Sequence, residues 1–155
     1  MKQMSRKKKE IPEKTLIVDN REPLNVVELL AKNSPLPIEF KQLVTGDYVV
    51  EDDDTVAIER KTLSDFADSI VDRRLFNQVD RLRKFPHSYV LISGKLDEVR
   101  SNVSPHAILG AVAYIASLGI TVVKVDSDEE LVYLILKLLE RHKKLILPNG
   151  QFIGE

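Results

Sequence analysis

Short apolar runs alternate with amphipathic segments along most of this 155-residue chain. The run at 15–18 is continuously apolar, which is typical of a buried strand, whereas 38–43 alternates between apolar and polar positions. Residues 47–50 and 55–61 predict a hairpin around the acidic turn at 51–54. The segments expected to form strands are 15–18, 38–43, 47–50, 55–61, 87–93 and 120–125.

Helix signals separate these strands. Pro23 suits the first turn of a helix, and Thr62 with Asp65 matches a capping box that opens another. Ser127 and Glu130 form a second capping box. The helices expected are one after Pro23, one after Thr62, and those at 74–84, 105–118 and 127–143. Helices that alternate with short strands predict a three-layer α/β/α domain. The three consecutive strands at 38–61, interpreted as a meander, predict a central mixed β-sheet.

Composition narrows the function classes. The chain has 23 Lys and Arg against 24 Asp and Glu, so no global basic field indicates nucleic-acid binding. The absence of cysteine excludes disulfides, thiolate zinc sites and cysteine nucleophiles. No apolar run suggests a signal peptide or a membrane span, so we expect an intracellular protein, in the cytoplasm or nucleoid, or the nucleus in a eukaryote. We expect residues 1–14 to be a flexible basic arm, either a loose phosphate-binding tail or a solvated terminus, and 15–155 to be one domain.

The charged run Glu59-Arg60-Lys61 follows the apolar positions of a predicted strand. Formal charges on a core strand are costly, so they suggest a functional site. Glu59 and Lys61 share one face, and Asp47 and Asp19 stand at the ends of neighbouring strands. Carboxylates brought this close repel one another unless a cation lies between them. The pattern therefore predicts a metal site, and Mg²⁺ with oxygen ligands can support phosphodiester hydrolysis.

Each residue also has a purely structural interpretation. Glu59 and Lys61 could form a surface ion pair, Asp47 after a glycine is ordinary turn chemistry, and Asp65 is the expected capping carboxylate. Arg21 and Arg60 could bind phosphate or orient the acids. A DNA-backbone role and a solvated helix face are both open for the basic cluster of Arg73, Arg74, Arg81, Arg83 and Lys84.

The spacing of three motifs resembles the nuclease domain of the XPF family of structure-specific DNA endonucleases. The motifs are Val-Asp-Asn-Arg-Glu at 18–22, Gly-Asp-Tyr at 46–48 and Glu-Arg-Lys-x-x-x-Asp at 59–65, with Arg74-Leu-Phe-Asn-Gln78 in further agreement. The resemblance covers roughly residues 14 to 145 and implies the restriction-endonuclease-like fold.

The resemblance also implies a role for each residue of the motifs. Asp47 and Glu59 would be metal ligands, and Asp19 would be a third ligand or a supporting acid. Lys61 would be the catalytic lysine, and Asp65 would support the site. The two arginines, Arg21 and Arg60, would contact phosphate or hold the acids. The metal would be Mg²⁺, with Mn²⁺ able to substitute.

Family members usually carry a tandem helix-hairpin-helix domain, and no such motif follows the last predicted helix. A separate DNA-binding partner could supply that role, the chain could be an excised domain, or the nuclease domain could act alone. The family also implies a homodimer, here through the helices at 105–118 and 127–143, whose apolar positions are wider than one core-facing stripe needs.

The function expected is therefore Mg²⁺-dependent cleavage of one DNA strand near flap or fork junctions, in repair or recombination. One alternative is a DNA-binding architectural subunit that needs a partner for cleavage, and another is a resolvase or repair nuclease with the same fold. The intact Glu59 and Lys61 favour an active enzyme over the architectural subunit.

Overall fold

The computed structural model describes residues 14–142. The basic arm predicted for residues 1–14 therefore lies outside the described residues except for its last position, and so does the tail beyond 142. The elements are, in chain order, β1 (Leu16–Asp19), α2 (Leu24–Asn33), β2 (Ile38–Lys41), β3 (Tyr48–Val50), β4 (Val56–Thr62), α3 (Leu63–Val71), α4 (Arg74–Leu82), β5 (His87–Ser93), the 3-10 turn η1 (Leu96–Glu98), α5 (Pro105–Ser117), β6 (Thr121–Val125) and α6 (Asp128–Arg141).

The six strands form one sheet in the order β2-β1-β3-β4-β5-β6. Strand β3 is antiparallel to both of its neighbours, and the remaining pairs are parallel, so the mixed sheet is confirmed. The predicted meander of three successive strands is wrong. Strand β1 lies between β2 and β3, because α2 carries the chain across the sheet and β2 returns parallel to β1 on its outer side.

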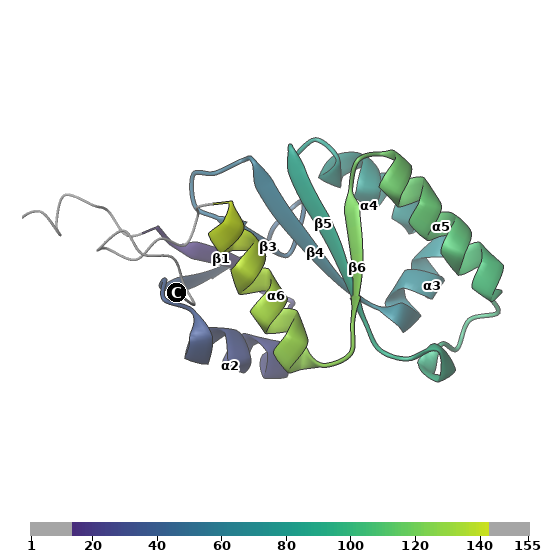
Figure 1. The fold of residues 1–155 in the computed structure, drawn as a ribbon, viewed down its shortest axis with the longest axis horizontal. Helices are drawn as coiled ribbons and strands as arrows, with labels where there is room; N and C mark the ends of the chain where they lie inside the picture. The colour runs from purple at the N-terminus through teal and green to yellow at the C-terminus, as the bar shows by residue number, and fades with distance from the viewer. Residues whose placement is uncertain (1–13, 143–155) are drawn as a thin grey trace, which may run out of the picture.

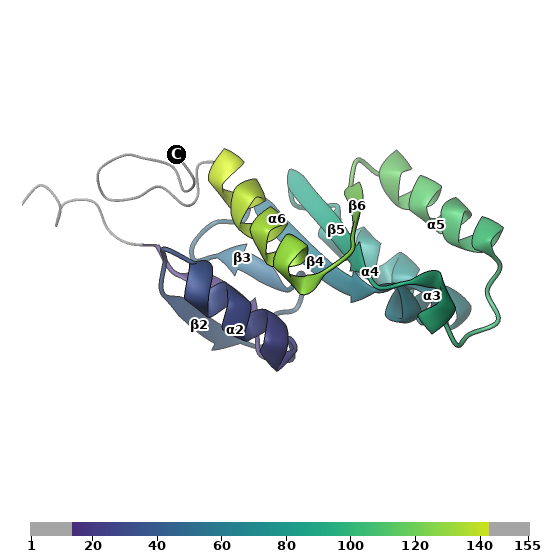
Figure 2. The same cartoon turned by 60° about the horizontal axis from the view of Figure 1, so that its bottom comes forward.

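Helices cover both faces of the sheet, which gives the predicted three layers. On one face, α2 and α6 pack on the side chains of Leu16, Tyr48 and Ile58. On the other, α3, α4 and α5 enclose a second core around Ala57 and Val90. Figures 1 and 2 show α2 and α6 side by side over one part of the sheet, with α5 at the far end of the molecule. No helix within residues 14–142 is long and apolar enough to cross a membrane.

The predicted helix starts are confirmed by their caps. The Thr62 and Ser104 hydroxyls accept hydrogen bonds from backbone N–H groups in the first turns of α3 and α5, and Ser127 does the same for α6. Strand β2 ends at Lys41, two residues before the predicted end. The reason lies in Leu43, whose backbone N–H turns away to donate to the Asp19 carboxylate.

Candidate active site

Three carboxylates form a row across neighbouring strands. Val18 pairs with Tyr48 and Tyr48 pairs with Ile58, so one position further along Asp19, Asp47 and Glu59 stand opposite one another. Asp19 N–H donates to the Asp47 carbonyl at 2.8 Å, which extends the β1–β3 pairing. Asp47 N–H donates to the Ile58 carbonyl at 2.8 Å, one residue out of the β3–β4 register, so Asp47 lies beside both Ile58 and Glu59. Neighbouring strands lie about 4.8 Å apart, so the row places one carboxyl group on each of three adjacent strands.

All three acids project from the same face of the sheet. Val18, Tyr48 and Ile58 face the core under α2 and α6. Because successive side chains alternate between faces, the adjacent acids face the layer of α3 and α4. Lys61 follows Glu59 by two residues and joins them on that face, as the sequence predicted.

The closeness of the acids shifts their protonation. Burial, together with the charges of Glu59 and Glu22, raises the pKa of Asp47 to about 8. Burial also raises the pKa of Glu59, although Lys61 acts in the opposite direction. Without a cation, Asp47 therefore holds a proton that an isolated carboxyl group would release at neutral pH.

Lys61 is the buried cation of the site, with only 7% of its surface exposed. Burial lowers the pKa of its ammonium group, Glu59 counteracts this shift, and Arg74 adds to it. An ammonium group of lowered pKa beside carboxylates is suited to positioning a water or to stabilising negative charge on a phosphate.

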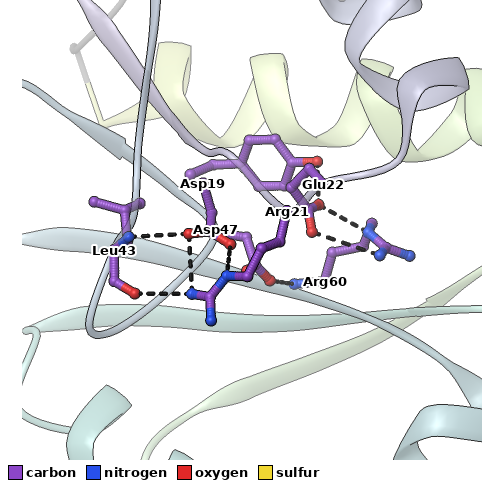
Figure 3. Close-up of polar contacts among 7 residues, drawn as sticks. Asp19, Arg21, Glu22, Leu43, Asp47 and Arg60 are labelled. Carbon is purple, nitrogen blue, oxygen red and sulfur yellow. Dashed lines mark hydrogen bonds and ion pairs between the residues drawn. The ribbon is translucent and has the colours of Figure 1, made fainter.

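Asp19 differs from the other two acids because protein groups already bind both of its oxygens. Arg21 Nε donates to Oδ2 at 2.8 Å and Nη2 donates to Oδ1 at 3.0 Å, while Leu43 N–H donates to Oδ1 at 2.9 Å (Figure 3). Burial alone would raise the pKa of Asp19, but the bonds from Arg21 and Leu43 hold it below the ordinary value. Arg21 Nη2 also donates to the Leu43 carbonyl at 3.1 Å, so the pair clamps the β2–β3 loop.

Arg60 pairs with Glu22, a residue outside the predicted site, and both line the same polar cavity as the acids. Arg60 Nε donates to Glu22 Oε1 at 2.8 Å, and the two side chains are only 12% and 5% exposed. The backbone N–H of Arg60 donates to Asp47 Oδ2 at 2.7 Å (Figure 3). Arg60 therefore orients Asp47. Glu22 closes the Val-Asp-Asn-Arg-Glu motif, which was the only sequence signal for it.

A polar cavity of about 410 Å³ lies over the row. Asp65 lines it, and the Thr62 hydroxyl accepts the Asp65 N–H at 3.0 Å. Lys61 is buried behind the lining rather than in it. Helix α4 contributes three lining side chains, Arg74, Gln78 and Arg81. Arg74 and Gln78 belong to the string that resembles the family, whereas the role of the basic residues is open from the sequence. Within residues 14–142, Gln78 Oε1 is one of the buried oxygens that accept no hydrogen bond.

The donor set fits a divalent cation of the Mg²⁺ type. Within residues 14–142, no group of three or more His, Cys, Asp and Glu side chains is arranged to hold a metal ion by itself. Mg²⁺ does not need such a group, because it commonly uses one or two carboxylates together with water and phosphate oxygens. Asp47 and Glu59 supply those two carboxylates, and their raised pKa values are the response expected of acids that lack a cation.

Comparison with known proteins identifies relatives of this chain. A family model described as the ERCC4 domain matches residues 18–138. A putative ATP-dependent RNA helicase of Methanocaldococcus jannaschii is 37% identical over 136 residues, which is 86% of this chain and 16% of that protein. The 3'-flap repair endonuclease Xpf of Saccharolobus solfataricus is 35% identical over 88 residues, which is 55% of this chain and 36% of that protein.

Two solved structures of XPF from Aeropyrum pernix share the fold. One has a TM-score of 0.70 with 27% identity and covers 84% of this chain and 65% of that chain. The other, a complex with DNA, has a TM-score of 0.72 with 28% identity over 86% of this chain and 66% of that chain. The chain thus spans only part of each relative.

Proposed function

The chain belongs to the ERCC4 domain family, the structure-specific endonucleases of the XPF type, and on that premise we propose that it is a metal-dependent DNA endonuclease. The observation that carries the proposal is the row of Asp19, Asp47 and Glu59 with Lys61 on one sheet face. Phosphodiester hydrolysis needs positive charge on the transferring phosphate and a positioned water, and this row offers sites for both.

Asp47 and Glu59 are the proposed ligands of one Mg²⁺, with Mn²⁺ as a substitute. When bound, the ion neutralises phosphate charge and makes a coordinated water more acidic. Asp19 is the third acid predicted, but its ion pair with Arg21 supports a different role. It holds the β2–β3 loop, and through that loop it holds Asp47.

The remaining residues position the reacting groups or neutralise charge. Lys61 donates a hydrogen bond to the attacking water or to a phosphate oxygen, since its ammonium group lies on the same face as the acids. Arg60 fixes Asp47 through its backbone N–H and neutralises Glu22, which lines the same cavity. Arg21 is 63% exposed at the cavity and so also remains available to a phosphate. Asp65 supports the site from the α3 side of the cavity.

The substrate proposed is DNA with a flap or fork junction, cut in one strand. One similar structure was solved as a complex with DNA, and one similar protein is a 3'-flap repair endonuclease. The architectural alternative predicts DNA binding without cleavage. The buried Lys61 beside Glu59 favours cleavage, because an uncompensated cost of burying charge is difficult to explain in a protein that only binds.

We also propose a homodimer, with α5 rather than α6 as its main surface. Helix α5 exposes Leu109 at 63% and Tyr114 at 41%. By contrast, the broad apolar side of α6 is largely occupied within the chain by α2 and the sheet, although Tyr133 is exposed. Light scattering should report twice the chain mass at micromolar concentration, and a monomer there would contradict this assembly.

The function is tested by cleavage of labelled flap, fork and four-way junction DNA, with plain duplex as the control. Wild type should cut a branched substrate in Mg²⁺ or Mn²⁺ and not in chelator, and Lys61→Ala should lose most of that activity. If Lys61→Ala cuts as well as wild type, the site is wrong. If no substrate is cut with either metal, the architectural alternative replaces the enzyme.

A further inference from the structure

Helix α4 carries two parallel stripes of side chains. Leu75, Val79 and Leu82 are buried against the core. Arg74, Gln78 and Arg81 each precede one of these positions and line the cavity over the carboxylate row. Positions four and three apart share a helix face, so these three residues form one polar edge of the pocket, which we term the α4 stripe.

The basic cluster, whose role the sequence left open, divides into residues that line the cavity and residues that do not. Arg73 has its guanidinium 5.0 Å from the centre of the Phe76 ring. Arg83 pairs with Asp80 at 3.0 Å, and Arg74 likewise pairs with Asp72 at 2.7 Å, so it is the cavity lining and not the ion pair that separates these two arginines. Arg73, Arg83 and Lys84 do not line the cavity. Two of the five basic residues therefore reach the site.

The stripe runs alongside β4 in the opposite direction. Arg81 is among the charges acting on Glu59, and Arg74 is among those acting on Lys61. Seven residues of α-helix rise about 10 Å, and one DNA strand carries a phosphate about every 3.4 Å of helix axis. Arg74 and Arg81 are thus about 10 Å apart along α4, on either side of Gln78, which is a separation wide enough to span more than one phosphate of a DNA strand.

Gln78 lies between the two arginines and has an unused acceptor. Its Oε1 is buried and accepts no hydrogen bond from any residue within 14–142. Phosphate diester oxygens cannot donate to it, because they are acceptors only. A water molecule can, and a buried acceptor left without a donor costs about 1–3 kcal/mol.

We propose that the α4 stripe is the track for the cleaved DNA strand, with Arg74 and Arg81 binding phosphates on either side of the scissile one and Gln78 accepting a hydrogen bond from the attacking water. The inference rests on the proposed nuclease function and assigns that function three further residues. Arg83 is excluded from the track and serves as the matched control.

DNA binding tests the phosphate contacts of Arg74 and Arg81, and cleavage tests the role of Gln78. In chelator, the affinity for a labelled fork DNA is measured against salt concentration for wild type, Arg74→Ala, Arg81→Ala and Arg83→Ala. Each lost phosphate contact should reduce the slope of log K against log salt by about 0.7–0.9. Arg74→Ala and Arg81→Ala should each show this reduction, and Arg83→Ala should keep the wild-type slope. Equal slopes for all four proteins, or no DNA binding, would overturn the track.

Gln78→Met tests the acceptor, because it keeps the length of the side chain and removes the amide. We expect DNA affinity to stay within twofold of wild type and single-turnover cleavage in Mg²⁺ to fall about tenfold or more. The melting temperature should not fall, since no internal hydrogen bond is lost. A lower melting temperature with normal cleavage would assign Gln78 to structure. Normal salt slopes with intact cleavage would refute the track alone, whereas shifted slopes without any cleavage would refute the nuclease function alone.

Discussion

At the scale of single residues, the site is a set of charges placed where the fold gains nothing from them. Asp47 and Glu59 are adjacent carboxylates that repel each other, and Lys61 is buried beside them. Arg60 and Glu22 form a buried ion pair that lines the same cavity. The first group is arranged for a ligand, and the second holds the first in place.

Stability without metal should therefore depend on pH through Asp47. Its folded pKa of about 8 exceeds the unfolded value of 3.8, so the folded state holds the proton more tightly. The stabilisation is complete below about pH 4 and is lost as pH rises towards 8. Asp47→Asn keeps an acceptor for Arg60 N–H and removes the charge. Its free energy of unfolding in chelator should exceed that of wild type at pH 8 by about 2 kcal/mol, and by little at pH 4.

Urea unfolding of both proteins in chelator at several pH values measures this difference. Glu59, Glu22 and Arg60 also act on Asp47, and all three residues are present in both proteins. A difference between the two proteins that does not change from pH 4 to pH 8 would show that Asp47 titrates normally.

The buried pair of Arg60 and Glu22 predicts a large loss of stability from a substitution that changes none of the three acids of the row. Glu22→Gln leaves the Arg60 guanidinium buried without its counter-charge, so unfolding should become easier by about 3 kcal/mol. Glu39→Gln is the matched control, because Glu39 pairs with Lys41 on the surface, where both side chains are about half exposed. That substitution should cost less than about 1 kcal/mol. Equal losses in chemical denaturation would contradict the buried ion pair.

At the scale of elements, the sequence pattern predicted what is local and missed what depends on neighbours. Strands, helix starts and the shared face of Glu59 and Lys61 follow from periodicity and caps, and they are confirmed. The position of β2 at the edge of the sheet, next to β1, could not be predicted from the sequence, because an apolar run specifies a strand but not its partner. For the same reason, the split of the α4 basic residues required the position of α4 against β4.

The turn before β3 gives a test at this scale. Gly46 has φ +78, and a Cβ there would lie 3.4 Å from the Ala57 Cβ. Gly46→Ala should cost about 1–2 kcal/mol and displace Asp47, so cleavage should also fall. Gly110 on α5 has nothing within 4 Å of an added Cβ, so Gly110→Ala should stabilise by about 0.5–1 kcal/mol. Thermal melting of both variants against wild type measures these changes in stability. A higher melting temperature for Gly46→Ala would show that the turn is not strained.

At the scale of the whole molecule, two cores on opposite faces of one sheet fix the site between them. Asp19 ends β1, Asp47 directly precedes β3 and Glu59 lies in the middle of β4, with α3 and α4 over them. The chain spans 16% of its helicase relative and 65% of a solved XPF chain. Each of these relatives therefore has parts that this chain does not match, whereas the chemistry proposed depends only on residues within the chain.

The most direct test of that chemistry is the single-turnover cleavage rate of a labelled fork DNA as Mg²⁺ is titrated. The rate of wild type should rise from zero in chelator to a saturating value. The saturating rate of Asp47→Asn should be lower by about 10³-fold or more, although the variant still binds the DNA. Asp80→Asn, on the exposed side of α4, should match wild type. Cleavage by wild type in chelator, or a wild-type rate for Asp47→Asn, would contradict a metal-dependent centre at the carboxylate row.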